Sequence, residues 1–390
     1  MPTYLTIEQL TGALSLRDLT DPEDGPHAMQ LLLSAIVDAL TGHWQVPARW
    51  TRASPLVTVF DNYDNLGFAP AAITRDSRYS RYVSSSVMLR SHTTAAIPAL
   101  LRSLAADQVT DGLQVLPGLV YRRDAIDRTH VGEPHQVDLW RLSSQVRLGT
   151  AELDDMVAVL VEAVLPGARW RAVPASHPYT DDGRQIDVLV DGQWLELAEC
   201  GLVPARLLHS SGLSPDRWSG LALGMGLDRA LMLRKGIDDI RMLRSADQRI
   251  AIQLQDLQRW RPVSMLPPIR RDLSIVIDSA DDDETLGDRV RAGLGPDADD
   301  LESVVVLART GYNRLPTAAR ERLGLAPTQL NALVRVVLRP LDRTLTDAEA
   351  NRLRDRIYRA IHRGPRLELI TDDLVLDEPS VDAAPAARAG

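Results

Sequence analysis

The chain has 390 residues, of which 45% are hydrophobic and 25% are charged, and its formal net charge is −9. This composition is ordinary for a soluble globular protein with two or three domains, and the negative charge argues against a protein coated for nonspecific nucleic-acid binding. No apolar run approaches the roughly 20 residues that span a bilayer. The first residues lack the basic and apolar regions of a signal peptide, so we expect a cytoplasmic protein with no membrane partner.

Two rare residue types exclude several kinds of site. Cysteine occurs once, at Cys200, which excludes an internal disulfide and a zinc site with several cysteine ligands. Among the 44 basic Lys and Arg residues only Lys235 is a lysine, and it does not lie in the glycine-rich pattern of a P-loop. Arginines and backbone amides must therefore hold the phosphates of any bound nucleotide.

The first half of the chain predicts helices before a series of strands. A helix is expected at 27–40, because its apolar residues recur on one face, and Gly42 is a plausible stop. A second helix is expected at 93–107, with Thr93 or Thr94 as its cap.

From residue 118 onward most strands follow one another without helices between them, which favours an antiparallel sheet. A clear amphipathic helix interrupts them at 152–165. The residues from 190 to 194, "VDGQW", are typical of a hairpin turn. The expected strands lie at 118–130, 135–142, 169–175, 185–190 and 193–203.

The proline-rich residues around 263 indicate a domain boundary. Beyond it, strands and helices alternate in an order that predicts a small ferredoxin-like α/β sandwich at 263–370, so the whole chain belongs to the α+β class. Its insertion at 310–331 carries several arginines, which are candidates for phosphate contacts. The acidic and then Ala/Pro-rich residues 371–390 are expected to form a disordered tail.

The candidate chemistry lies in four segments that occur in a fixed order. Alone, the pair Gly224 and Gly226 is weak evidence, because such glycines more often form a turn before a helix. Together the segments resemble the catalytic domain of phenylalanyl-tRNA synthetases, which are class II enzymes, over most of residues 26–250. The segments are "LRSHTT" (89–94), "YRRDAIDRTHVGEPHQVD" (121–138), "WLELAECGL" (194–202) and "GMGLDRALML" (224–233).

The second segment resembles motif 2 of this family, and the fourth resembles motif 3. The C-terminal part, 263–370, resembles the ferredoxin-like anticodon-binding domain of the single-chain organellar form. The resemblance therefore implies a class II catalytic domain at 1–262 that forms an aminoacyl adenylate from an amino acid and ATP, with Mg²⁺ as a cofactor, and charges a tRNA.

The resemblance also implies roles in ATP binding for several residues. Arg122 would bind the α-phosphate and the substrate carboxylate, and Arg229 would anchor the γ-phosphate from the start of a helix. Gly224 and Gly226 would let the backbone approach ATP, His130 would line the adenylate pocket, and Glu196 would bind Mg²⁺.

The implied amino-acid site would supply acceptors to the substrate ammonium group from Gln136, Asp124 and Thr94, with Asp138 and His92 beside them. His92, His130 and Thr94 are about equally well explained as structural residues. Asp124 is also a candidate partner that orients Arg122 or Arg123.

Three departures from the family concern the amino-acid side-chain pocket. Leu221 and Leu223 stand where the family has pocket phenylalanines, and Pro134 replaces another. Glu199 stands where the family has a small residue, commonly glycine. We expect Glu199 either to face the substrate side chain and pair with a donor, or to turn outward to a structural arginine; strand alternation allows both.

Several alternatives remain open from the sequence. The Arg-Tyr loop at 75–82 is a candidate substrate lid or acceptor-stem contact, although an exposed solvated loop is the simpler interpretation. A second hypothesis is an adenylating paralogue of specialised metabolism that passes a different amino acid to a carrier protein, a small molecule or an unusual tRNA. A third is a non-enzymatic regulatory or RNA-binding relative. The chain is expected to be a monomer or a homodimer, with the helix at 27–40 as a candidate contact.

Overall fold

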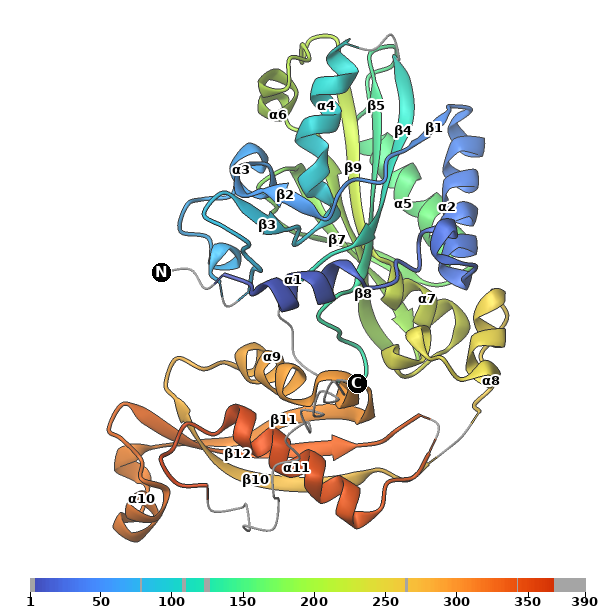
Figure 1. Cartoon of the computed structure of the whole chain (residues 1–390). Coiled ribbons are helices and arrows are strands. Elements are labelled where there is room, and N and C mark those ends of the chain that lie inside the picture. The colour runs from blue at the N-terminus through green and yellow to red at the C-terminus, as the bar shows by residue number, and fades with distance from the viewer. Residues whose placement is uncertain are drawn as a thin grey trace, which may run out of the picture.

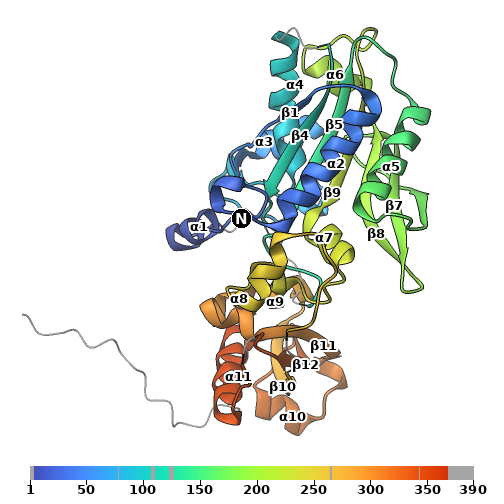
Figure 2. The ribbon, with the colours of Figure 1, turned by 90° about the vertical axis from the view of Figure 1, so that its right-hand side faces the viewer.

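The computed structural model describes residues 4–77, 79–106, 110–122, 127–263, 266–341 and 343–367. Figure 1 shows a tall unit with a large sheet above a smaller unit with its own sheet. The large sheet has seven strands and the small one has three. Figure 2 shows helices α7 (Leu227–Lys235) and α8 (Gln248–Ala251) between the two sheets.

The large sheet confirms the expected α+β class and its mainly antiparallel pairing. All neighbouring strands are antiparallel except the edge pair β1 and β4, which is parallel. The strand order is β1 (Ala48–Trp50), β4 (Asp111–Leu119), β5 (His135–Ser143), β9 (Ser219–Gly226), β8 (Gln193–Leu202), β7 (Asp181–Val190) and β6 (Trp170–Pro174).

Helices α2 (Ala28–Trp44), α5 (Thr150–Val164) and α7 cover one face of this sheet and form the main core with it (Figure 1). The expected apolar face of α2 is buried there. Gly42 does not end this helix, which continues to Trp44 and stops at the left-handed Gln45. A glycine costs a helix only about 1 kcal/mol, which the packing of α2 outweighs.

Helices α4 (Ile97–Ala106) and α6 (Ala205–Ser210) cover only one end of the opposite face. Together with Trp140 and Ala222 they form a smaller core. The uncovered remainder of this face carries the candidate site residues.

The expected strand at 118–130 is wrong, because β4 ends at Leu119. Strand β4 instead consists mainly of the buried residues that precede the expected strand. It includes Pro117, which pairs with β5. On the other side of β4, strand β1 pairs only as far as Val115. The missing N–H of Pro117 therefore interrupts no hydrogen-bonded ladder on that side.

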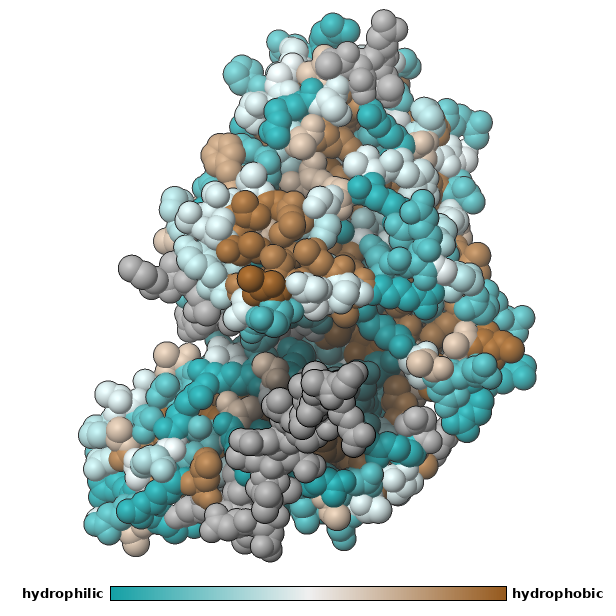
Figure 3. All heavy atoms as spheres, viewed as in Figure 1, coloured by the Kyte–Doolittle hydropathy of each residue, from teal (hydrophilic) through white to brown (hydrophobic). Residues whose placement is uncertain are grey.

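A short N-terminal helix, α1 (Ile7–Leu14), was not expected from the sequence. Its signal is a capping box in which Thr6 and Gln9 satisfy each other's backbone amides. A two-stranded ribbon of β2 (Leu56–Thr58) and β3 (Val87–Leu89) lies beside it, with α3 (Val59–Asn62) between these strands in the chain. Figure 3 shows a hydrophobic patch over this part of the surface.

The smaller unit has the ferredoxin-like order expected from the sequence. Its strands lie in the order β10 (Ile269–Asp278), β12 (Gln329–Leu338), β11 (Leu301–Gly311), with α9 (Asp283–Leu294) and α11 (Asp347–Ile361) on one face. Helix α10 (Thr317–Leu323), in the insertion, packs through Leu323 on Val276. The expected tail at 371–390 lies outside the described residues.

Two further expectations concern the whole chain. Among the described residues, each helix is too short or too polar to cross a bilayer. Helix α2, the candidate dimer contact, buries its apolar side within the chain and exposes Leu31. The division near residue 263 stays a prediction.

Lys235 is fully buried at the end of α7. Its ammonium group donates hydrogen bonds to the backbone oxygen of Asp256 at 2.8 Å, the Asp256 carboxylate at 3.1 Å and the backbone oxygen of Gln258 at 2.7 Å. The only lysine of the chain therefore connects α7 through hydrogen bonds to the segment that leads to the smaller unit. It is not available for catalysis.

We predict that Lys235→Met lowers the free energy of unfolding by about 1–3 kcal/mol, because it removes three hydrogen bonds that a buried ammonium group donates to Asp256 and Gln258. Urea unfolding measures this change. The matched control is Arg352→Met, which removes the same charge from an exposed position on α11 and should change stability by less than about 0.5 kcal/mol. If the two substitutions lowered stability equally, the hydrogen bonds of Lys235 would not make the proposed contribution to stability.

Candidate active site

Three site residues form a row across neighbouring strands of the large sheet. Asp138 on β5 and Glu199 on β8 both lie directly opposite Gly224 on β9. Residues directly opposite one another in antiparallel strands point to the same face. A Cβ atom built on Gly224 would meet no atom within 4 Å, so open space lies above this glycine, between the two carboxylates.

A second row of residues lies two positions further along the strands. Gln136 lies opposite Gly226, where an added Cβ would again meet nothing within 4 Å. On β8 the register slips between Ala198 and Glu196, which leaves Leu197 without a partner as a β-bulge. A bulge interrupts strand alternation, and it allows Glu196 and Glu199 to lie on the same face although they are three positions apart.

Arg229, His130 and Glu196 come together beside this second row. Arg229 lies in the first turn of α7; its Nη2 is 3.4 Å from His130 Nε2, and its Nη1 is 3.5 Å from the backbone oxygen of Glu196. Removal from water and the neighbouring Glu199 charge raise the pKa of Glu196, against the opposing effect of Arg229. Arg229 therefore only partly offsets the effects of burial and of Glu199 on the Glu196 carboxylate.

The His130 ring is held in turn by Asp127, whose Oδ2 lies 2.7 Å from Nδ1. Burial opposes ionisation of Asp127, but hydrogen bonds from His130 and Thr129 still hold its pKa below the usual range. The His130 side chain is thus oriented toward Arg229 by a charged carboxylate.

Arg122 follows the end of β4 and is fixed through its backbone and its side chain. Its N–H donates to the Gly132 oxygen at 2.8 Å, and its Nε donates to the Ser91 oxygen at 2.7 Å. Arg81 donates to the Arg122 oxygen at 3.0 Å and forms an ion pair with Glu133 at 2.5 Å. Asp124, the other predicted residue of this segment, lies outside the described residues.

Asp138 is buried and accepts three side-chain hydrogen bonds. Thr93 and Thr94 donate to its Oδ2 at 2.5 and 3.1 Å, and Trp140 donates to its Oδ1 at 2.9 Å. Burial raises the pKa of Asp138 although these bonds oppose the rise. The prediction that Thr93 or Thr94 caps a helix is wrong, because no side-chain cap bond is formed there and both hydroxyls bind this carboxylate.

His92 is half-buried, and its ring stacks on two aromatic rings that also contact each other. Its ring centroid lies 5.7 Å from that of Phe68 and 6.4 Å from that of Tyr179. Burial and the Arg122 charge lower the pKa of His92 to about 3, so it is uncharged near neutral pH. Among the described residues, neither ring nitrogen has a hydrogen-bond partner.

Glu199 faces the open side of the sheet and pairs with a histidine. Its Oε1 lies 3.0 Å from His177 Nε2, while His177 Nδ1 lies 3.2 Å from the Thr180 hydroxyl. The hydrogen bond from His177 lowers the pKa of Glu199. Of the two expectations for Glu199, the outward pairing with a structural arginine is wrong.

The sequence analysis did not identify His177 or Tyr179 as site residues. Both lie in the loop between β6 and β7, and their rings stack with centroids 5.9 Å apart. A small cavity of about 10 Å³ is bordered by this loop and by Asp138, Glu199 and Gly224. The available signal was a histidine and a tyrosine close together in a loop between two strands.

Strand alternation corrects the predicted pocket on β9. Leu221 and Leu223 are buried in the main core with α2 and α5, whereas Ala222 and Gly224 lie on the site face. Leu221 is therefore not a pocket residue, and Leu223 borders the small cavity only from within that core. Cys200 belongs to the same core, and burial raises its thiol pKa to about 12.

The Arg-Tyr loop at 75–82 is packed against the protein, so its interpretation as a solvated loop is wrong. Arg75 stacks over Tyr63 and pairs with Asp64 at 3.0 Å. Tyr79 donates to Asp282 of the smaller unit at 2.9 Å. Arg78 lies outside the described residues.

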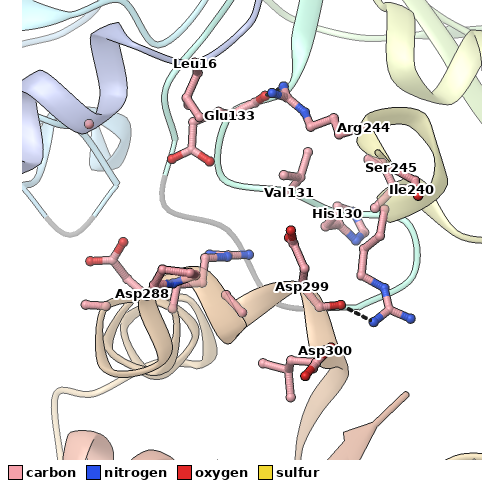
Figure 4. A pocket seen from close by; sticks show the side chains of 18 of the residues that line it. Leu16, His130, Val131, Glu133, Ile240, Arg244, Ser245, Asp288, Asp299 and Asp300 are labelled. Carbon is pink, nitrogen blue, oxygen red and sulfur yellow. Dashed lines mark hydrogen bonds between the residues drawn. The ribbon is translucent and has the colours of Figure 1, made fainter. Parts of the chain in front are cut away.

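A cavity of about 1000 Å³ lies between His130 and the smaller unit. Figure 4 shows His130 and Arg244 on its upper wall and Asp288 and Asp299 on the lower one. Arg241 bridges the two units by donating to the Asp299 oxygen at 2.9 Å. The cavity therefore brings solvent to the His130 side of the site.

The carboxylates of the site suit a Mg²⁺ ion that is bound together with nucleotide phosphates. No cluster of three or more His, Cys, Asp or Glu side chains suited to a metal exists within the described parts of the chain. Magnesium in nucleotide sites needs only one or two carboxylates together with phosphate oxygens and water. Glu196, with Glu199 near it and incomplete charge compensation, fits that pattern.

Comparisons with known proteins agree with this arrangement. Residues 34–254 match the family described as tRNA synthetases class II core domain (F). The phenylalanine–tRNA ligase alpha subunit of Prochlorococcus marinus is 33% identical over 60% of this chain and 69% of its own length. The chloroplastic/mitochondrial phenylalanine–tRNA ligase of Arabidopsis thaliana is 27% identical over 88% of this chain and 78% of its own length.

We predict that Glu199→Gln reduces the loss of stability in acid. Because the folded pKa of Glu199 is lowered, its carboxylate stabilises the fold above the ordinary value of 4.5, and this contribution disappears as the pH falls through the folded pKa. Urea unfolding between about pH 6 and pH 3 should therefore show a steeper loss in the wild type than in Glu199→Gln. The exposed control Glu321→Gln should follow the wild type; identical curves for Glu199→Gln and the wild type would refute the prediction.

Proposed function

This chain is a ligase of the class II tRNA synthetase family, and we propose that it activates an amino acid with ATP and transfers it to a tRNA. The substrate carboxylate attacks the α-phosphate of ATP, and the bond to pyrophosphate breaks. A tRNA hydroxyl then attacks the carbonyl carbon of the aminoacyl adenylate, and AMP leaves.

The observation that carries this proposal is the convergence of Arg229, His130 and Glu196 beside the open backbone at Gly226. Arginine is a bidentate donor to phosphate oxygens, and the N-terminal amides of α7 point to the same region. Since Lys235 is buried and bonded, arginine must supply the positive charge.

Arg122 holds the α-phosphate and the substrate carboxylate in this proposal. Its backbone and side chain are fixed by Ser91, Gly132 and Arg81, so its position is set before substrates bind, which favours catalysis by orientation. Mg²⁺, when bound, neutralises charge on the phosphate oxygens, and Glu196 would hold it there. Arg229 binds the γ-phosphate.

The amino-acid end lies over Gly224. We infer that Gln136, Thr94 and Asp138 orient the substrate ammonium group, with Asp124 and His92 as further members of the site. Asp138 is already fixed by three donors, which keeps an acceptor of defined geometry beside the open space. Glu199 on the other side marks a side-chain pocket that differs from the family pattern.

The ferredoxin-like unit favours tRNA as the acceptor. The Arabidopsis ligase matches 88% of this chain, so the similarity extends beyond the catalytic sheet. The altered pocket favours a second candidate, an adenylating paralogue that delivers a different amino acid to a carrier protein, a small molecule or an unusual tRNA. The cytoplasmic location and the monomeric or homodimeric state stay predictions.

We predict that Arg229→Ala abolishes ATP–pyrophosphate exchange, with a loss of at least about 100-fold in kcat/KM, because the γ-phosphate loses its anchor. Exchange assays with a panel of amino acids measure the loss, and thermal unfolding shows that the fold is retained. Arg352→Ala, which changes an exposed arginine on α11, should leave exchange unchanged. Full exchange by Arg229→Ala would rule out the proposed phosphate site.

Charging assays separate the two candidate acceptors. The main proposal expects that an amino acid supporting exchange also becomes attached to purified tRNA. Exchange without tRNA charging would instead favour the carrier or small-molecule acceptor.

A further inference from the structure

We propose that the pair Glu199–His177 forms the side-chain subsite, and that the substrate is a small amino acid whose side chain ends in a hydroxyl or amino group. This inference rests on the proposed function and names the substrate class of the same site.

The position of the pair is the first argument. Glu199 lies opposite Gly224, on the far side of the open space from Asp138. An amino acid whose ammonium group lies beside Asp138 therefore directs its side chain toward Glu199 or toward the sheet. The next pair of residues on this face of the sheet, Trp140 and Ala222, is buried and leaves no space for a side chain.

The size of the remaining space is the second argument. The cavity bordered by Asp138, His177, Tyr179 and Glu199 measures about 10 Å³. A cavity of about 10–15 Å³ holds one water molecule, whereas a cavity that binds benzene measures about 150 Å³. One hydroxyl or amino group fits the cavity, and a phenyl ring does not.

The Tyr179 ring explains why this space is small. It stacks with the rings of both His92 and His177, and His177 is held by Glu199 and Thr180. Opening the cavity to admit a large apolar side chain would break this series of contacts.

The polarity of the cavity is the third argument. Glu199 is a pure acceptor when ionised, and only one of its oxygens has His177 as its partner at 3.0 Å. The Glu199 side chain is 40% exposed, so its carboxylate is accessible to water before a substrate binds. A methyl group would displace this water without replacing its hydrogen bonds, whereas a hydroxyl or amino group donates to the carboxylate.

The charges of the site also favour a substrate side chain that donates a hydrogen bond. In the proposed function Arg122 and Arg229 are occupied by phosphate and carboxylate groups, and Asp138 has its own donors. Among the described residues, His177 is the side chain that pairs with Glu199. A substrate donor completes its hydrogen bonding.

Matched substrates test the inference by ATP–pyrophosphate exchange with the full chain. The pairs serine and 2-aminobutyrate, threonine and valine, and 2,4-diaminobutyrate and norvaline each compare a polar side chain with an apolar one of similar shape. We expect the polar member of the best pair to exceed its partner by on the order of 100-fold or more in kcat/KM, and phenylalanine to be poorer still.

The outcomes distinguish this inference from the proposed function. Exchange with no amino acid would contradict the proposed function. Exchange that is best with phenylalanine or another apolar amino acid would overturn the inference alone and leave the proposed function in place.

Two variants test the pair itself. Glu199→Gly enlarges the cavity and removes the acceptor, so we expect the polar preference to fall below about tenfold and larger apolar substrates to gain activity. Glu199→Gln keeps the size and removes the charge, so it should weaken the polar preference without admitting larger substrates. The exposed control Glu321→Gln should match the wild type. A preference that stays unchanged in a folded Glu199 variant with normal KM for ATP would overturn the role of Glu199.

Discussion

The register of strands β5, β9 and β8 is the constraint on which the rest of the site depends. It aligns Asp138, Gly224 and Glu199 in one row, and the glycine leaves the space between the carboxylates open. A shift of one residue would turn each of these side chains toward the helices, because side chains alternate between the faces of a sheet. The main core formed with α2 and α5 therefore also sets the geometry of the site.

The two halves of the site follow from this register in different ways. In the proposed function, the ATP half uses positions next to the sheet, where α7 presents Arg229 and the loop after β4 presents Arg122. The amino-acid half depends on the β6–β7 loop, which brings His177 to Glu199. In the proposed function, a change at this loop and at Glu199 alters the amino-acid half without moving Arg122 or Arg229.

The fold was predictable from the sequence where the evidence is local. The periodicity of α2 and α5 and the turn between β7 and β8, where Asp191 and Gly192 have positive φ, were recognised. Other features depend on contacts between distant segments. The face occupied by Leu221 follows from strand pairing, the position of Glu196 relative to Glu199 follows from a bulge, and the partner of Glu199 comes from another loop. Sequence patterns therefore identified the acidic residue but not its partner.

In the proposed site, a phosphate-binding half accompanies a small, polar side-chain subsite. Isothermal titration calorimetry with stable sulfamoyl analogues of the aminoacyl adenylate measures both halves together, because each analogue fills both at once. We expect the seryl analogue to bind the full chain about 100-fold more tightly than the phenylalanyl analogue. Equal or tighter binding of the phenylalanyl analogue would contradict the claim.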